Sequence, residues 1–286
     1  MSMSKKNQLS FWVFSAFVAF VWACQPAQKD ETAGVEEGPV VWVVDSVKIH
    51  KAGTRRINNS DTTQTNVHVS FPLLKNKNVS PEVVSQINAR IEQKIKDIVW
   101  GWTNFEENVK TPTKSVEALA EEFIRMAEQD LASFNEDVPT SFMSYELEVT
   151  GKVDYINEKV ASITFSTYSF TGGAHPNSAV EVLNISLETG KELGLEEMIT
   201  DTVALKKVVE EAFIANEKKE LQEVVMSDYF FEEGFALPSS ISVKPNGLYF
   251  VYSPYEAASY ARGYIEFEIP FTKLGTLVNK DKLGIK

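Results

Sequence analysis

The feature that most constrains the fold is the order in which two hydrophobic periods occur along the chain. Val67, Val69 and Phe71 alternate with polar residues, as in a strand with one wet face. Residues 80–102 and 115–134 instead carry apolar residues at spacings of three and four, which is typical of amphipathic helices. Alternation with period two then returns after residue 143. This order predicts an α+β fold in which two amphipathic helices pack against a mainly antiparallel sheet.

The ends of the predicted elements carry recognisable signals. Ser80 followed by Pro81 is typical of a helix start, with serine as the N-cap and proline in the first turn. A further helix is predicted at 201–221, and further strands are predicted at 143–150, 160–170, 179–186, 241–243, 247–252 and 264–269. Burial against a sheet explains both apolar helix stripes without a partner protein.

The folded part is predicted to contain two subdomains. An N-terminal α+β companion domain covers residues 39–138, and a C-terminal α+β domain covers residues 139–286. The boundary follows the polar segment 135–141 (NEDVPTS), which separates the two-helix part from the strand-rich part. Whether these subdomains fold independently is left open by the sequence.

The amino terminus has the pattern of an export signal. Lys5 and Lys6 precede Leu9–Trp22, an uncharged and largely apolar run of 14 residues, which is shorter than the roughly 20 that cross a bilayer. The run closes on VWAC (21–24), which resembles the lipobox of bacterial lipoproteins. We therefore expect a signal peptide at 1–23 and acylation of Cys24, and two or more acyl chains anchor a protein stably. A short membrane anchor or a plain signal peptide is the alternative.

The segment after Cys24 predicts a location. Residues 24–38 are rich in charge, Ala, Gly and Pro, which is typical of a flexible tether. Residues 28–31 (QKDE) resemble a short export signal of surface lipoproteins in Gram-negative bacteria. We expect a lipid-anchored protein of the cell envelope at the outer membrane, and both its surface and its periplasmic face remain open.

The charge balance restricts the partners. The chain has 28 basic and 40 acidic residues, a net charge of −12. Loss of Lys5 and Lys6 with the signal peptide leaves 26 basic against 40 acidic residues, a net charge of −14. Such a surface repels phosphate backbones, so no nucleic-acid partner is expected, whereas a cationic protein would be attracted.

The sequence offers few groups for catalysis. Cys24 is the one cysteine, and the three histidines are His50, His68 and His175. Metalloprotease, nucleophile-elbow and phosphate-loop motifs are absent from the sequence. We interpret His50 and His68 as surface residues on the wet faces of strands. Adjacent acid pairs are expected by chance among 40 acids, so no catalytic residue, metal or cofactor is predicted and the chain is interpreted as a non-enzyme.

Two segments depart from this background, 168–177 (YSFTGGAHPN) and 252–263 (YSPYEAASYARG). Two successive glycines permit positive φ, and clustered tyrosines either pack locally or contact a ligand. In one interpretation the glycine turn packs beneath the tyrosine-rich loop, and the Glu256 carboxylate accepts hydrogen bonds from loop amides. In the other the segments form a ligand-binding site. Its candidate residues are Gly172, Gly173, His175, Tyr252, Tyr255, Glu256 and Tyr260.

These segments carry a family resemblance. TGGAHPN, GLYFVYSPYEAASYARG and the following Ile269-Pro270-Phe271 resemble the signature of the RsiV-like C-terminal domain family, a domain of unknown function. The region 40–135 is similar in order and pattern to its usual N-terminal companion, so the resemblance covers about residues 40–278. The family's usual PYEIAPYA is PYEAASYA here, with Ser259 in place of a proline. The signature residues by matching position are Gly172, Gly173, His175, Pro254, Tyr255, Glu256 and Tyr260.

The resemblance implies a binding module outside the cytoplasm. In the family such domains form the outer part of an anti-sigma factor that binds lysozyme, and they are appended to polysaccharide deacetylases. A cationic lysozyme-like protein is therefore one expected partner. The alternative is peptidoglycan or another glycan, on which Tyr255, Tyr260 or Trp102 would stack. A cell-wall hydrolase or a deacetylase accessory is the third hypothesis.

Overall fold

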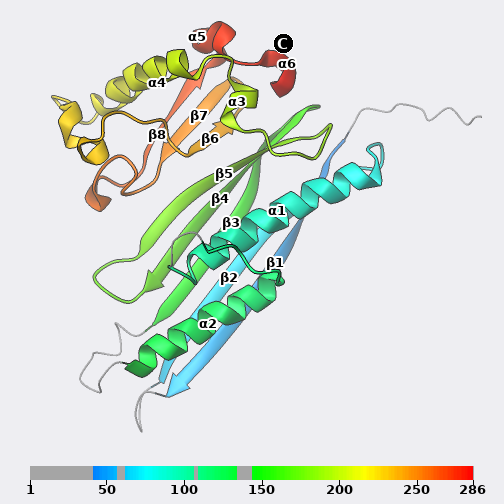
Figure 1. Ribbon diagram of the computed structural model, residues 1–286, viewed down its shortest axis with the longest axis vertical. Coiled ribbons are helices and arrows are strands. Elements are labelled where there is room, and N and C mark those ends of the chain that lie inside the picture. The colour runs from blue at the N-terminus through cyan, green and yellow to red at the C-terminus, as the bar shows by residue number, and fades with distance from the viewer. Residues whose placement is uncertain (1–40, 57–61, 106–108, 134–143, 286) are drawn as a thin grey trace, which may run out of the picture. The chain divides into compact units, whose positions relative to one another are not determined.

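The computed structural model describes residues 41–56, 62–105, 109–133 and 144–285 (Figure 1). The predicted signal peptide, tether and acylation site at Cys24 lie outside these residues. The predicted seam at 135–141 also lies outside them.

The first sheet has five strands in the order β1-β2-β3-β4-β5. Its pairs are antiparallel except for β2 with β3, which run parallel. Two helices connect β2 to β3, and a parallel pair needs a connection of this length. The expected α+β class is therefore confirmed. The elements are β1 (Val43–Arg56), β2 (Thr62–Lys75), α1 (Pro81–Gly101), α2 (Val116–Ser133), β3 (Tyr145–Ile156), β4 (Val160–Thr171) and β5 (Asn177–Ser186).

The second sheet is antiparallel and has the strand order β6-β7-β8. The predicted helix at 201–221 is observed as the shorter helix α4, capped by the Asp201 side chain, which accepts a hydrogen bond from the Ala204 N–H. The elements are α3 (Leu195–Met198), α4 (Thr202–Glu217), β6 (Ser240–Val243), β7 (Gly247–Tyr252), β8 (Ile265–Pro270), α5 (Phe271–Leu274) and α6 (Lys280–Leu283).

Helices α1 and α2 lie side by side on one face of the first sheet (Figure 1). The predicted cap of α1 is present, since the Ser80 hydroxyl accepts a hydrogen bond from the Val83 N–H. The predicted apolar stripes face inward, where they pack with residues of the sheet such as Leu147 and Phe165. The fully buried stripe residues include Ile87, Ile91, Ile95, Leu119 and Phe123.

The second sheet has its own core around an aromatic cluster. Phe213 of α4 is fully buried and meets Tyr229, Tyr252 and Phe267 edge to face. Edge-to-face geometry brings the positive ring edge against the negative ring face. This cluster fixes α4 against β7 and β8, and so fixes the strands that hold the tyrosine-rich loop.

The observed division between cores differs from the predicted boundary at 138/139. Strands from both sides of that boundary, β2 and β3, pair in one sheet. The last buried residue in the core of the first sheet is Leu187. The buried residues of the second core begin at Leu193, apart from Val160. The polar segment at 135–141 signals a loop, but a local pattern carries no information about which distant strand β3 will pair with.

Strand β2 contains a proline, Pro72, and continues beyond it to Lys75. Pro72 pairs with Ser46 of β1, whereas β3 pairs with β2 only as far as Ser70. A proline lacks the backbone N–H, so it is tolerated where the strand has an open side. The strand therefore passes through this proline.

A buried polar junction joins the two sheets. The Ser162 hydroxyl of β4 donates to the Asn184 side-chain oxygen of β5 at 2.7 Å, and the Asn184 amide donates to the Ile241 carbonyl at 2.8 Å. The Val243 N–H donates to the Ser162 oxygen at 3.1 Å. Because a buried polar group without a partner is costly, this network specifies how β6 docks on β4 and β5.

We expect Asn184→Ala to lower the free energy of unfolding by about 2 kcal/mol, because it removes the acceptor of the buried Ser162 hydroxyl and the amide donor to the Ile241 carbonyl. Urea unfolding followed by circular dichroism measures the change. The matched control is Asn66→Ala on the exposed side of β2, which should change stability by less than about 0.5 kcal/mol. Equal effects of the two substitutions would contradict the role of the junction.

Candidate functional site

The structure brings three of the candidate residues together. His175 lies in the connection between β4 and β5, and its ring stacks on Tyr260 from the loop between β7 and β8, with centroids 3.9 Å apart and planes at 15°. The Tyr255 ring lies 5.8 Å from that of Tyr260, and its hydroxyl is 3.5 Å from Nε2 of His175. We call His175, Tyr255 and Tyr260 the loop surface.

Glu256 holds the loop from within. Its carboxylate accepts hydrogen bonds from the Ser253 N–H at 2.9 Å and the Ser239 N–H at 2.6 Å. The predicted contact of this carboxylate with loop amides is thus present. Both oxygens are engaged by backbone amides, so Glu256 positions the loop rather than presenting a charge to a ligand.

Backbone conformation explains the two glycines. Gly172 and Gly173 have φ of 84° and 93°, in the region that L-residues rarely adopt. A Cβ at Gly173 would meet nothing within 4 Å, so conformation and not crowding requires glycine there. Tyr255 also has a positive φ, 71°, which is uncommon for a bulky residue and persists only where its surroundings impose it.

Tyr252 is not available to a ligand, which corrects its assignment as a binding residue. Its side chain is 1% exposed and packs in the aromatic cluster around Phe213. Its hydroxyl donates to the Ala236 carbonyl at 2.8 Å, and burial raises its pKa above the usual range. Tyr252 is the last residue of β7, where its ring meets Phe213 of α4, whereas Tyr255 lies beyond the strand end.

Sequence reasoning missed the ion pair beneath the loop surface. Arg262 donates from Nε and Nη2 to the two carboxylate oxygens of Glu217 in α4, at 2.8 and 2.7 Å. Glu217 is fully buried, and the Tyr229 hydroxyl also donates to it at 2.8 Å. The hydrogen bonds to Glu217 raise the pKa of Arg262. Burial, and then the hydrogen bond from its own hydroxyl to Glu217, raise the pKa of Tyr229 to about 12. The one signal in the sequence was an acid near the end of an apolar-faced helix.

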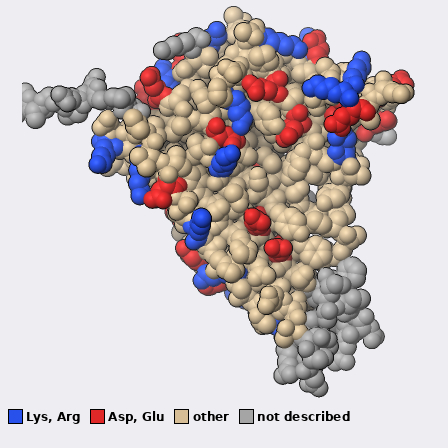
Figure 2. Space-filling view, turned by 180° about the vertical axis from the view of Figure 1, so that it is seen from behind, with Lys and Arg blue, Asp and Glu red and all other residues tan. Residues whose placement is uncertain are grey.

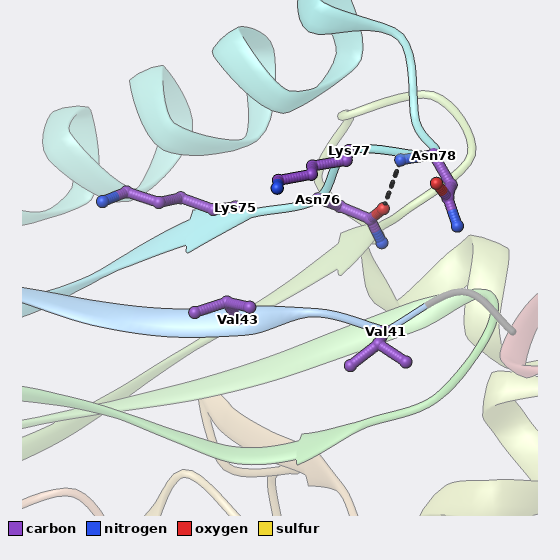
Figure 3. A pocket seen from close by; sticks show the side chains of 6 residues that line it. All are labelled: Val41, Val43, Lys75, Asn76, Lys77 and Asn78. Carbon is purple, nitrogen blue, oxygen red and sulfur yellow. Dashed lines mark hydrogen bonds between the residues drawn. The ribbon is translucent and has the colours of Figure 1, made fainter. Parts of the chain in front are cut away.

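A separate hollow of about 440 Å³ lies near the start of β1 and the turn after β2. Val41 and Val43 lie near the segment that follows β2 (Figure 3), where the Asn78 N–H donates to the Asn76 side-chain oxygen at 2.8 Å. None of the predicted binding residues lines it. The lining residues are Val41, Val43, Lys75, Asn76, Lys77 and Asn78.

Two features are absent from the described part of the chain. No group of three or more His, Cys, Asp or Glu side chains there is arranged to hold a metal ion. None of the helices described is long and apolar enough to span a bilayer.

The fold and the loop surface define an α+β module of two sheets, with exposed aromatic side chains on loops that internal hydrogen bonds and an ion pair hold in place. Residues 197–272, which include most of that surface, match the model of a protein family of unknown function (DUF3298). Residues 58–178 match a model described as Deacetylase PdaC. Each match covers less than half of the chain, so each is a similarity of that segment to its family model.

Two solved structures are similar. A DUF3298 family member from Bacteroides fragilis NCTC 9343 has a TM-score of 0.66 and 15% identity, over 85% of this chain and 96% of that chain. A DUF3298 family protein from Pseudomonas aeruginosa PAO1 has a TM-score of 0.57 and 18% identity, over 84% and 96%. At these identities the likeness shows the fold. A comparison with curated proteins gave no match.

Substituting Arg262→Gln should lower the free energy of unfolding by about 3 to 5 kcal/mol, because it leaves the buried Glu217 carboxylate without its partner. Thermal and guanidinium unfolding measure the loss. In Arg262→Gln/Glu217→Gln both charges are gone, so part of the stability should return. A single substitution that unfolds like the parent would show that the pair contributes nothing.

Proposed function

We propose that this protein is a non-catalytic binding module of the cell envelope that recognises a protein partner through the loop surface. The observation that supports this proposal most strongly is that the rings of Tyr255 and His175 are exposed although their positions are fixed. The Tyr255 side chain is 53% exposed, and Glu256 and Arg262 hold its loop from beneath. His175 is also exposed, and its ring stacks on Tyr260 of that loop. Fixed aromatic side chains lose little entropy on binding and are enriched among the residues that dominate binding energy.

The similarity to known families supports the proposed location in the cell envelope. The match to the Deacetylase PdaC model and the match to DUF3298 suggest a module related to the cell envelope. The RsiV-like resemblance adds a cationic lysozyme-like protein as the partner, and the net charge of −12 favours encounter with a basic protein. Figure 2 shows acidic and basic side chains interspersed on one face, so this attraction comes from net charge rather than from an acidic patch on that face.

A glycan is the second candidate, favoured by the exposed ring of Tyr255. An aromatic face can stack on a sugar ring without any charge. Trp102 does not serve this role, because it is partly buried and packs against the core of the first sheet. Salt separates the two candidates, since screening weakens a charge-steered protein complex and leaves stacking on a neutral sugar almost unchanged.

Replacement of Tyr255 by alanine should weaken binding of the full chain to lysozyme about tenfold or more, because it removes an exposed aromatic anchor. Biolayer interferometry with the immobilised protein, at 50 and 500 mM NaCl, measures the affinity and its dependence on salt. Purified peptidoglycan is tested in parallel by co-sedimentation.

Phe105→Ala is the control, since Phe105 is an exposed aromatic residue on the segment after α1, outside the loop surface. It should bind lysozyme as the parent does. Binding to peptidoglycan alone, insensitive to salt and lost in Tyr255→Ala, would favour the glycan candidate. Retention of neither probe, or equal retention by both variants, would remove the proposed site.

Membrane attachment through Cys24 belongs to the same proposal, on the strength of the lipobox-like VWAC sequence. We expect Cys24→Ala to move the protein from the membrane fraction of its host to the aqueous fraction, because the acyl chains are lost. Fractionation with immunoblotting measures this change, and mass spectrometry of the parent should show a diacylated or triacylated Cys24. An unmodified thiol on the membrane-derived protein would refute the anchor.

A further inference from the structure

Two of the three histidines form a cross-strand pair. His50 of β1 lies directly opposite His68 of β2 in the antiparallel register. Their rings are stacked, with centroids 4.2 Å apart and planes at 11°. The sequence predicts two separate surface residues, and both are exposed, but the strand pairing places the two imidazoles side by side.

The pair lies on the face of the sheet opposite the helices. Lys51, the neighbour of His50, points to the helix side, where it pairs with Glu121 of α2 at 2.6 Å, and successive side chains of a strand alternate between faces. Glu148 of β3 is opposite His68 in the parallel register, so a carboxylate continues the row. These residues line a hollow of about 350 Å³. Its lining is Lys48, Ile49, His50, His68, Val69, Ser70, Glu148 and Thr150.

This combination of groups has the chemistry of a metal site. A neutral imidazole presents a ring-nitrogen lone pair, and imidazole suits borderline divalent cations such as Zn²⁺ and Ni²⁺. A carboxylate is a further ligand for such ions. The net charge of −12 attracts cations generally, whereas the Lys48 ammonium in the same hollow opposes them.

We propose that His50 and His68, with Glu148 as a weaker third ligand, bind one borderline divalent cation at the open face of the sheet. The three side chains do not converge in the structure described, so the imidazoles rotate about their side-chain bonds to turn a ring nitrogen toward the ion. Their exposure and the hollow around them leave room for this rotation, and water fills the remaining coordination positions. The site involves no residue of the loop surface.

A bound ion would add a link between the side chains of two paired strands. β1 is at the edge of the sheet and pairs with β2 alone among the described strands. An ion held by His50 and His68 links this edge strand to its neighbour. A ligand that binds only the folded state stabilises it, so the thermal midpoint gives a readout that does not depend on any activity.

Isothermal titration of the full chain in detergent with ZnCl₂ and NiCl₂ at pH 7.5 tests the site, together with thermal unfolding. We expect one ion per chain and a raised thermal midpoint. His50→Gln and His68→Gln should each weaken zinc binding about tenfold or more, because each removes one of two imidazole ligands. Glu148→Gln should weaken it less, and Lys48→Gln should strengthen it, since an opposing charge is gone.

His175→Gln is the matched control, because it removes the remaining histidine and should leave zinc binding unchanged. Lowering the pH to 5.5 should weaken binding to the parent, since a protonated imidazole has no lone pair to offer. MgCl₂ should bind no better than buffer, because this hard ion prefers an oxygen cage. Zinc binding that survives in His50→Gln/His68→Gln, or no heat from either transition-metal ion, would overturn the proposal.

Discussion

The parallel pairing of β2 with β3 is the constraint on which the rest of the structure depends. It joins strands from the two halves of the sequence into one sheet, and it requires the long connection that α1 and α2 supply. Because both helices pack on the same face, the opposite face is free of them. Part of that face holds the Ser162 and Asn184 junction on which the second sheet docks, and another part holds the paired histidines.

The loop surface depends on interactions that are themselves hidden. Glu256 binds backbone amides, and Arg262 reaches the buried carboxylate of Glu217, so the charged groups of the loop are used to hold it. The ring of Tyr255 remains exposed. A buried ion pair contributes little net stability, yet its geometry is demanding, and it ties the loop to α4 in one arrangement. The charged side chains therefore fix the loop, and the exposed aromatic ring is left to contact a partner.

Local patterns predicted most of the elements and part of the site. The cap at Ser80, the apolar stripes of α1 and α2 and the alternation of β8 are each set by neighbouring residues, so they could be recognised in the sequence. The predicted bonds of Glu256 to loop amides are likewise short-range. The burial of Tyr252 and the partner of Arg262 could not be predicted, because both depend on residues of α4 and its surroundings that are distant in the sequence.

By itself, the sequence determined the α+β class, the positions of the helices and strands and the two loops that carry the aromatic residues, because periodicity, caps and turn residues act over a few positions. Tertiary structure alone decided that one sheet contains strands from both sides of the predicted boundary at 138/139. It also decided that His175 stacks on Tyr260 and that His50 stacks on His68. These contacts arise from strand register and from loops that approach across the fold. Their physical cause is pairing between distant backbone segments, which leaves no local pattern in the residues involved.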